Sequence, residues 1–211
     1  MKIMFSIPTH LTAIAIVDSA TIDRLPVTAQ NRPDCSAPMT QAEINFCANE
    51  EFAEVDAELN CVYNRVIGNL SETRRELLID AQLDWIDYRD AQCELAGSAV
   101  AGGALQPLYI STCKTTLTEV RTAELSAYGE NRYPGSNASD LATVDRQHRD
   151  AFNTRCSRSN VRLVDASERA WQNYRNTACE FERSGGGNAA FENCRIRLTE
   201  RRIQELNRSS R

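Results

Sequence analysis

Eight cysteines are the residues with the most chemistry in this chain of 211 residues, and their spacing already excludes several uses of a thiol. No two of them form the CxxC pair that is typical of a zinc ribbon or a redox site. An even number of widely spaced cysteines is typical instead of disulfides made in an oxidising compartment, because a reducing cytosol keeps thiols free. The sequence therefore predicts disulfide bonds and no metal centre.

Other catalytic groups are scarce. The only histidines are His10, near the start of the chain, and His148, which has no equivalent in the other half of the internal repeat described below. Carboxylates are too common here to indicate acid–base chemistry, and no glycine-rich loop runs into a Lys-Ser or Lys-Thr pair that would bind phosphate. We therefore expect a binding protein with no cofactor rather than an enzyme.

An internal repeat organises the chain. WIDYRDAQCE at 85–94 recurs as WQNYRNTACE at 171–180, an offset of 86 residues, and these segments hold the only two tryptophans. Further matches follow at an offset of 81 from Cys113 to Cys194 and from Arg121 to Arg202, and at an offset of 89 from Asp56 to Asp145. Self-similarity of this kind indicates a duplicated structural unit. We expect a first copy at 35–128, a linker at 129–138 and a second copy at 139–211.

Each copy reads as three helices, so the predicted fold class is all-α. Thr40 and Glu43 form a capping box before a helix that runs to about residue 70, with a break near Asn49 left open. Ser71 is placed to cap a second helix, and Pro107 to open a third. The second copy is expected to repeat them at about 140–157, 161–183 and 189–207. Its expected caps are Ser139 and Asn188.

Disulfides are expected to staple these helices into hairpins. Cys93 with Cys113 and Cys179 with Cys194 each enclose a glycine-containing loop, and closing about 15 to 20 residues stabilises by roughly 3 kcal/mol. Cys35 and Cys47 are the natural pair at the N-terminus. Cys61 and Cys156 remain, and a disulfide between them would join the two copies. Eight cysteines allow 105 connectivities, so other pairings stay open.

Residues 1–34 read as a signal peptide followed by an N-terminal segment. Lys2 precedes a mostly apolar stretch that Pro8 interrupts. No other segment approaches the roughly 18 apolar residues of a membrane-spanning helix, so no membrane span is expected. The expected location is the periplasm or the exterior of the cell.

Charge divides the chain into two halves. Residues 35–128 hold 15 acidic against 6 basic side chains, a net charge of −9, and residues 129–211 hold 11 against 15, a net of +4. An acidic surface attracts basic partners, and a net of +4 over so long a segment is too weak to indicate nucleic-acid binding.

The motif residues resemble the LprI-like lysozyme-inhibitor domain of bacterial envelope proteins. The pattern covers the first copy well, and the second copy resembles a diverged form of it. The resemblance implies a small disulfide-bonded helical domain, export and, in some members, inhibition of lysozyme. The residues that carry it are Asp56, Leu59, Asn60, Tyr63, Gln82, Trp85, Tyr88, Arg89 and Arg121 in the first copy, and Trp171, Tyr174, Arg175 and Arg202 in the second.

Most of these motif residues have a structural interpretation. Trp85 and Trp171 lie on apolar helix stripes and are expected in the core. A partly buried arginine needs a carboxylate or a carbonyl as its partner, and a structural ion pair of Arg89 with Asp56 is the favoured role, with the equivalent pair in the second copy. Asn60 and Gln82 are expected to be buried hydrogen-bonding groups.

Two functions remain open. One is an inhibitor that binds lysozyme and occludes its cleft. The residues expected to reach the cleft lie on the stapled loop of the first copy and are Glu94, Gln106 and Tyr109. The other is an envelope structural or interaction module with a different protein or glycan partner. Its oligomeric state is not predicted.

Overall fold

The first helix begins at the capping box that its sequence predicts. In the computed structural model, which describes residues 32–136 and 140–208, the hydroxyl of Thr40 accepts the N–H of Glu43 and the carboxylate of Glu43 accepts the N–H of Thr40. Helix α1 (Gln41–Gly68) then runs without a break. Asn49 does not interrupt it, because this residue is exposed, where an asparagine costs a helix only a fraction of a kcal/mol.

The rest of the first copy follows the predicted pattern. Helix α2 (Glu72–Gly97) starts after Ser71, which is the N-cap residue but makes no side-chain capping bond. A short 3₁₀ helix, η1 (Ser98–Val100), leads into the stapled loop. Helix α3 (Gln106–Gly129) has its proline in the first turn, where the missing N–H costs no hydrogen bond.

The second copy repeats this order. Helix α4 (Leu141–Cys156) is capped by Asp140, whose carboxylate accepts the N–H groups of Ala142 and Thr143. Ser139, the expected cap, lies outside the described residues. Helix α5 (Val161–Arg208) turns back on itself at Gly187, whose φ of 70° lies in the left-handed region that favours glycine. It therefore consists of two arms, 161–186 and 188–208, which match the two predicted helices.

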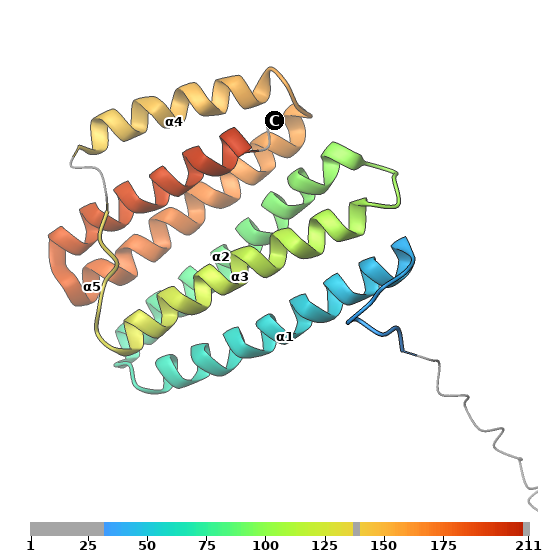
Figure 1. The fold of residues 1–211 in the computed structure, drawn as a ribbon. Coiled ribbons are helices and arrows are strands. Elements are labelled where there is room, and N and C mark those ends of the chain that lie inside the picture. The colour runs from blue at the N-terminus through green and yellow to red at the C-terminus, as the bar shows by residue number, and fades with distance from the viewer. Residues whose placement is uncertain (1–31, 137–139, 209–211) are drawn as a thin grey trace, which may run out of the picture. The chain divides into compact units, whose positions relative to one another are not determined.

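The helices pack in a fixed sequence of neighbours (Figure 1). Helix α1 packs on α3, α3 on α2, α2 on α5, and α4 on α5, so α2 and α5 form the interface between the copies. One hydrophobic cluster runs through both copies and includes both tryptophans, each 2% exposed. The described residues contain helices and no strand, which confirms the all-α prediction.

The predicted linker contacts both copies through Tyr133. The hydroxyl of Tyr133 accepts a hydrogen bond from Arg74 at 2.8 Å, and its ring lies over the turn of α5. A Cβ atom on Gly185 would stand 1.8 Å from the Tyr133 oxygen, which is far inside van der Waals contact. The glycines of this turn therefore allow a close approach of the linker.

Three of the four expected disulfides are present. They join Cys35 to Cys47, Cys93 to Cys113 and Cys179 to Cys194, and the last two staple the α2–α3 hairpin and the two arms of α5.

The fourth expected disulfide is wrong. Cys61 on α1 is exposed and free, and Cys156 at the end of α4 is also free. The packing order explains this, because α1 contacts α3 whereas α4 contacts α5, so the two helices that carry these thiols lie on opposite sides of the α2–α5 interface.

Two further expectations concern the membrane and export. Among the described residues, none of the helices combines the length and apolarity that crossing a membrane requires. The expected signal peptide lies outside the described residues.

Candidate functional site

Two tyrosines at the interface between the copies bind across it in a reciprocal way. Tyr88 of α2 donates its hydroxyl to a carboxylate oxygen of Glu205 in the second copy. Tyr174, its counterpart, donates to Glu124 of the first copy at 3.0 Å. The two tyrosine rings stack with centroids 5.6 Å apart and planes 7° from parallel. The four residues thus form an approximately two-fold arrangement, in which each copy supplies a hydrogen-bond donor to the other.

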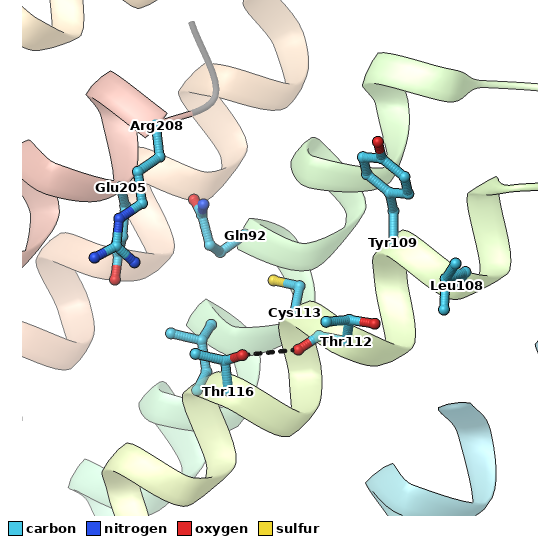
Figure 2. Close-up of a pocket in the computed structure, with 9 residues that line it drawn as sticks. Gln92, Leu108, Tyr109, Thr112, Cys113, Thr116, Glu205 and Arg208 are labelled. Carbon is cyan, nitrogen blue, oxygen red and sulfur yellow. Dashed lines mark hydrogen bonds between the residues drawn. The ribbon is translucent and has the colours of Figure 1, made fainter. Parts of the chain in front are cut away.

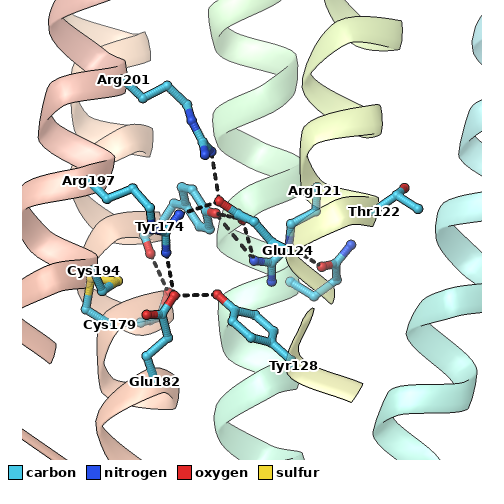
Figure 3. Close-up of polar contacts among 12 residues, drawn as sticks. Arg121, Thr122, Glu124, Tyr128, Tyr174, Cys179, Glu182, Cys194, Arg197 and Arg201 are labelled. Carbon is cyan, nitrogen blue, oxygen red and sulfur yellow. Dashed lines mark hydrogen bonds and ion pairs between the residues drawn. A yellow bond between two sulfur atoms is a disulfide. The ribbon is translucent and has the colours of Figure 1, made fainter. Parts of the chain in front are cut away.

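Glu124 is the most heavily paired carboxylate at this interface (Figure 3). It is buried, and its oxygens lie near the guanidinium nitrogens of Arg121 at 3.3 Å, Arg197 at 2.6 Å and Arg201 at 2.9 Å. Burial alone would raise the pKa of Glu124, but the three arginines outweigh burial and hold the pKa well below its usual range. Glu124 is therefore ionised at neutral pH and joins α3 to the second arm of α5.

A second buried carboxylate closes this network on one side. Glu182 accepts a hydrogen bond from Tyr128 at 2.6 Å and pairs with Arg197 at 2.5 Å. Burial nevertheless leaves the pKa of Glu182 above its usual value. The network has donors and acceptors facing one another inside the protein, so it is suited to holding the copies together rather than to reacting with a substrate.

The second copy builds an equivalent cluster around Arg202, which is fully buried. Its Nε donates to Glu168 at 3.1 Å, and its Nη1 donates to Gln92 of the first copy at 2.6 Å. Glu168 also faces the His148 ring at 3.1 Å. Burial would raise the pKa of Glu168, but the hydrogen bond with His148 and the charge of Arg202 lower it overall. The first copy has the neutral Gln82 in place of this carboxylate.

The motif residues mostly take the structural roles that we predicted. Arg89 pairs with Asp56 at 2.8 Å, and Gln82 is buried and accepts a hydrogen bond from the buried arginine of α3 at 3.0 Å. The equivalent pair in the second copy, Arg175 with Asp145, has a nitrogen–oxygen distance of 3.8 Å.

The expectation that Asn60 is buried is wrong. It is exposed and donates to Asp56 at 3.2 Å, because it lies on the solvent side of α1.

A groove of about 260 Å³ lies between α1 and α2, and several motif residues of the first copy line it, both exposed and buried. Asp56, Asn60 and Tyr63 lie on the α1 side. The α2 side carries Ile79 and Leu83, which are 37% and 58% exposed. Exposed aliphatic side chains beside a groove are a common feature of protein-binding surfaces.

The residues that we expected to bind a partner do not form one site. Tyr109 is 46% exposed and lines a cavity of about 440 Å³, together with Gln92 and Glu205 from the interface (Figure 2). Glu94 and Gln106 line a different cavity, of about 490 Å³, at the stapled loop. Glu94 is exposed, but the side chain of Gln106 accepts the N–H of Gly102 at 2.9 Å and so helps to hold the loop.

Sequence reasoning missed the two carboxylates that receive the tyrosines and the aliphatic row beside the groove. Glu124 and Glu205 each follow a motif arginine by three residues and match at the offset of 81, so the repeat held a signal for them. Ile79, Leu83 and Ile86 recur at steps of four and three residues, a second apolar row on α2 that a single core-facing stripe does not explain.

Within the described ranges, no group of three or more histidine, cysteine, aspartate or glutamate side chains is placed to hold a metal ion.

Comparison with known proteins links this geometry to relatives. An uncharacterised protein of Rhizobium meliloti (strain 1021) is 39% identical over 115 residues, which is 48% of this chain and 83% of the relative. A crystal structure of an uncharacterised protein from Burkholderia thailandensis superposes with a TM-score of 0.59 at 13% identity, covering 87% of this chain and 91% of the other. The second likeness shows a shared fold.

The family comparison covers both copies. The model of the lysozyme inhibitor LprI matches residues 34–125 and again residues 138–206. These segments agree with the two repeats read from the sequence, and together they cover most of the chain, so the protein belongs to the LprI lysozyme-inhibitor family.

Proposed function

We propose that this chain is an exported protein that binds a lysozyme and inhibits it by occluding the muramidase cleft. The match of the LprI inhibitor family to both copies carries this proposal. Three disulfides support export, because such bonds persist in oxidising compartments.

The charge distribution gives the proposal a physical basis. Lysozymes are typically basic, and the first copy has a net charge of −9. Opposite charges raise the rate of association more than they set the final affinity. An inhibitor that meets its enzyme at low concentration outside the cytoplasm gains most from such steering, which weakens as salt rises.

Two substrates in parallel test the proposal. The full oxidised chain is added at micromolar concentration to several lysozyme types, and lysis of bacterial cell walls is followed by turbidity. The same mixtures are then assayed on a short soluble chito-oligosaccharide. A protein that occludes the cleft slows both reactions, because even a small substrate has to enter the cleft.

A protein that instead coats the cell wall slows only the turbidity assay. That result would replace the proposal by glycan binding, and no effect on either substrate with any lysozyme type would remove it altogether. Reduced and alkylated chain serves as the control for unspecific effects of added protein.

A further inference from the structure

One face of α2 in the first copy is acidic and unpaired. Glu76, Asp80, Leu83, Asp87 and Glu94 follow one another at steps of four, three, four and seven residues, so they share one helix face, and all five are exposed. In the described part of the chain, none of the four carboxylates makes a side-chain hydrogen bond or an ion pair. The face therefore presents four negative charges to solvent around one leucine.

This face continues into the groove beside α1. Leu83 is 58% exposed and lies one turn from Ile79, which is 37% exposed. Both side chains line the groove, where the half-buried Tyr63 and Ile86 extend the apolar surface towards α1. An apolar centre with a charged rim is the usual composition of a protein interface.

The second copy shows that the helix does not need this chemistry in order to fold. At the offset of 86, the same five positions hold Arg162, Ala166, Arg169, Asn173 and Glu180. The acidic face has become mainly basic and neutral, and Glu180 is near Arg183 at 3.6 Å. Two copies with the same helix arrangement thus differ at this surface, which points to a role outside the fold.

We infer that the exposed face of α2 in the first copy, together with the adjoining α1–α2 groove, docks a partner protein whose surface is basic around an apolar contact. The inference rests on the proposed function, under which the partner is a basic lysozyme. Charge complementarity selects this partner. Leu83 with Ile79 supplies the central contact, and the surrounding carboxylates steer the approach.

The test measures association and dissociation rates of an immobilised basic lysozyme with the full oxidised chain at low and high salt. In the triple variant Glu76→Gln, Asp80→Asn, Asp87→Asn, we expect the association rate at low salt to fall about tenfold and the salt dependence to flatten. In Leu83→Ser, we expect dissociation to become about tenfold faster, because an apolar contact at the centre is lost. Leu83→Gln serves as a second variant.

Matched controls remove the same groups elsewhere. The triple variant Glu119→Gln, Asp150→Asn, Glu192→Gln changes the net charge equally at exposed positions on α3, α4 and α5. Val161→Ser removes an aliphatic side chain that is 51% exposed in the second copy. Both controls are expected to keep the wild-type rates within about twofold.

The outcomes separate the two proposals. If the wild-type chain binds lysozyme and the α2 variants keep wild-type rates, the docking surface is wrong and the proposed function stands. Equal losses in the α2 triple and the control triple would also overturn the surface, because total charge alone would then explain binding. If the wild-type chain binds no lysozyme, the docking surface and the proposed function are both wrong. Sedimentation of the chain alone then shows whether the acidic face instead pairs with a second copy of this chain.

Discussion

Leu83 and Arg169 occupy the same place in the two copies of the repeat, on the outer face of equivalent helices, whereas Tyr88 and Tyr174 occupy the same place on the inner face. The tyrosines are identical and make reciprocal bonds to the opposite copy. The outer residues differ in both charge and polarity. The contacts between the copies thus require the same residue type on the inner face of both helices, whereas the exposed apolar side chain on the outer face is specific to the first copy. Binding to a partner should therefore reside in one copy, and stability in both.

Separating the copies should have the largest effect. Residues 35–128 expressed alone lose every contact with α5, including those of α2 and the two α5 arginines that pair with Glu124 on α3. We expect the isolated copy to be destabilised by about 5 kcal/mol or more, since it exposes the apolar surface that the second copy covers.

The reciprocal contacts also predict what the isolated copy does next. Tyr88 of one molecule can reach Glu124 of another, so we expect 35–128 to dimerise as its concentration rises, which analytical ultracentrifugation measures. A fragment that stays monomeric at hundreds of micromolar with the stability of the full chain would refute the view that the copies depend on each other.

Removing one carboxylate from each copy should give unequal losses. Glu124→Gln leaves three arginines without their shared partner, and we expect the free energy of unfolding to fall by about 3–5 kcal/mol. Glu205→Gln should cost less, about 1–3 kcal/mol, because Arg202 keeps Glu168. Urea unfolding measures both, with Glu119→Gln as an exposed control. Equal losses would mean that the two halves of the network are energetically alike.

A substitution in the glycine turn of α5 should have a smaller effect on stability, and the first copy has no equivalent turn. Gly185→Ala places a methyl group against Tyr133 of the linker, so we expect a loss of about 1–3 kcal/mol in thermal unfolding experiments. Gly68→Ala, at the end of α1, meets no atom within 4 Å and should be neutral within about 0.5 kcal/mol. A neutral Gly185→Ala would show that the linker does not lie on this turn in solution.

Acid should weaken the interface through Glu124. Its folded pKa is lowered below the ordinary value of 4.5, so its contribution is fully present above that pH and is lost as pH falls through the folded pKa. We expect the melting temperature to drop below about pH 4.5, and to drop less in Glu124→Gln.

Glu182→Gln is the contrasting variant for this pH series. Burial raises the folded pKa of Glu182, so its protonation favours the folded state in acid, and this variant should be at least as sensitive to acid as the wild type. A Glu124→Gln protein as sensitive to acid as the wild type would assign the effect to other carboxylates.

Local patterns predicted much of the fold, and long-range partners account for what they missed. Helix periodicity placed both tryptophans in the core. The glycine-containing loops paired two disulfides correctly, and closeness at the N-terminus paired Cys35 with Cys47. The partner of Tyr88 is 117 residues away, and no local pattern encodes which two helix faces meet. The same limit explains the wrong Cys61–Cys156 pairing, because spacing does not reveal that α1 and α4 pack on different neighbours.

The site shows a similar division. The residues expected to bind a partner were placed on the stapled loop, whereas the exposed aliphatic side chains beside the groove lie on α2. The sequence did contain a signal for that face. Ile79, Leu83 and Ile86 form a second apolar row on α2, separate from the stripe that faces the core. Whether such a row is exposed depends on where α1 lies, which only the packing shows.

Exchanging the outer chemistry of the two copies in the full chain tests the central claim most directly. The variant Ile79→Asp, Leu83→Arg gives the first copy the residues of the second, and Asp165→Ile, Arg169→Leu does the reverse. The measurement is the rate at which a basic lysozyme lyses cell walls in the presence of each chain. The account predicts that the first variant leaves lysis uninhibited, while the second inhibits at least as well as the wild type. Full inhibition by the Ile79→Asp, Leu83→Arg chain would contradict it.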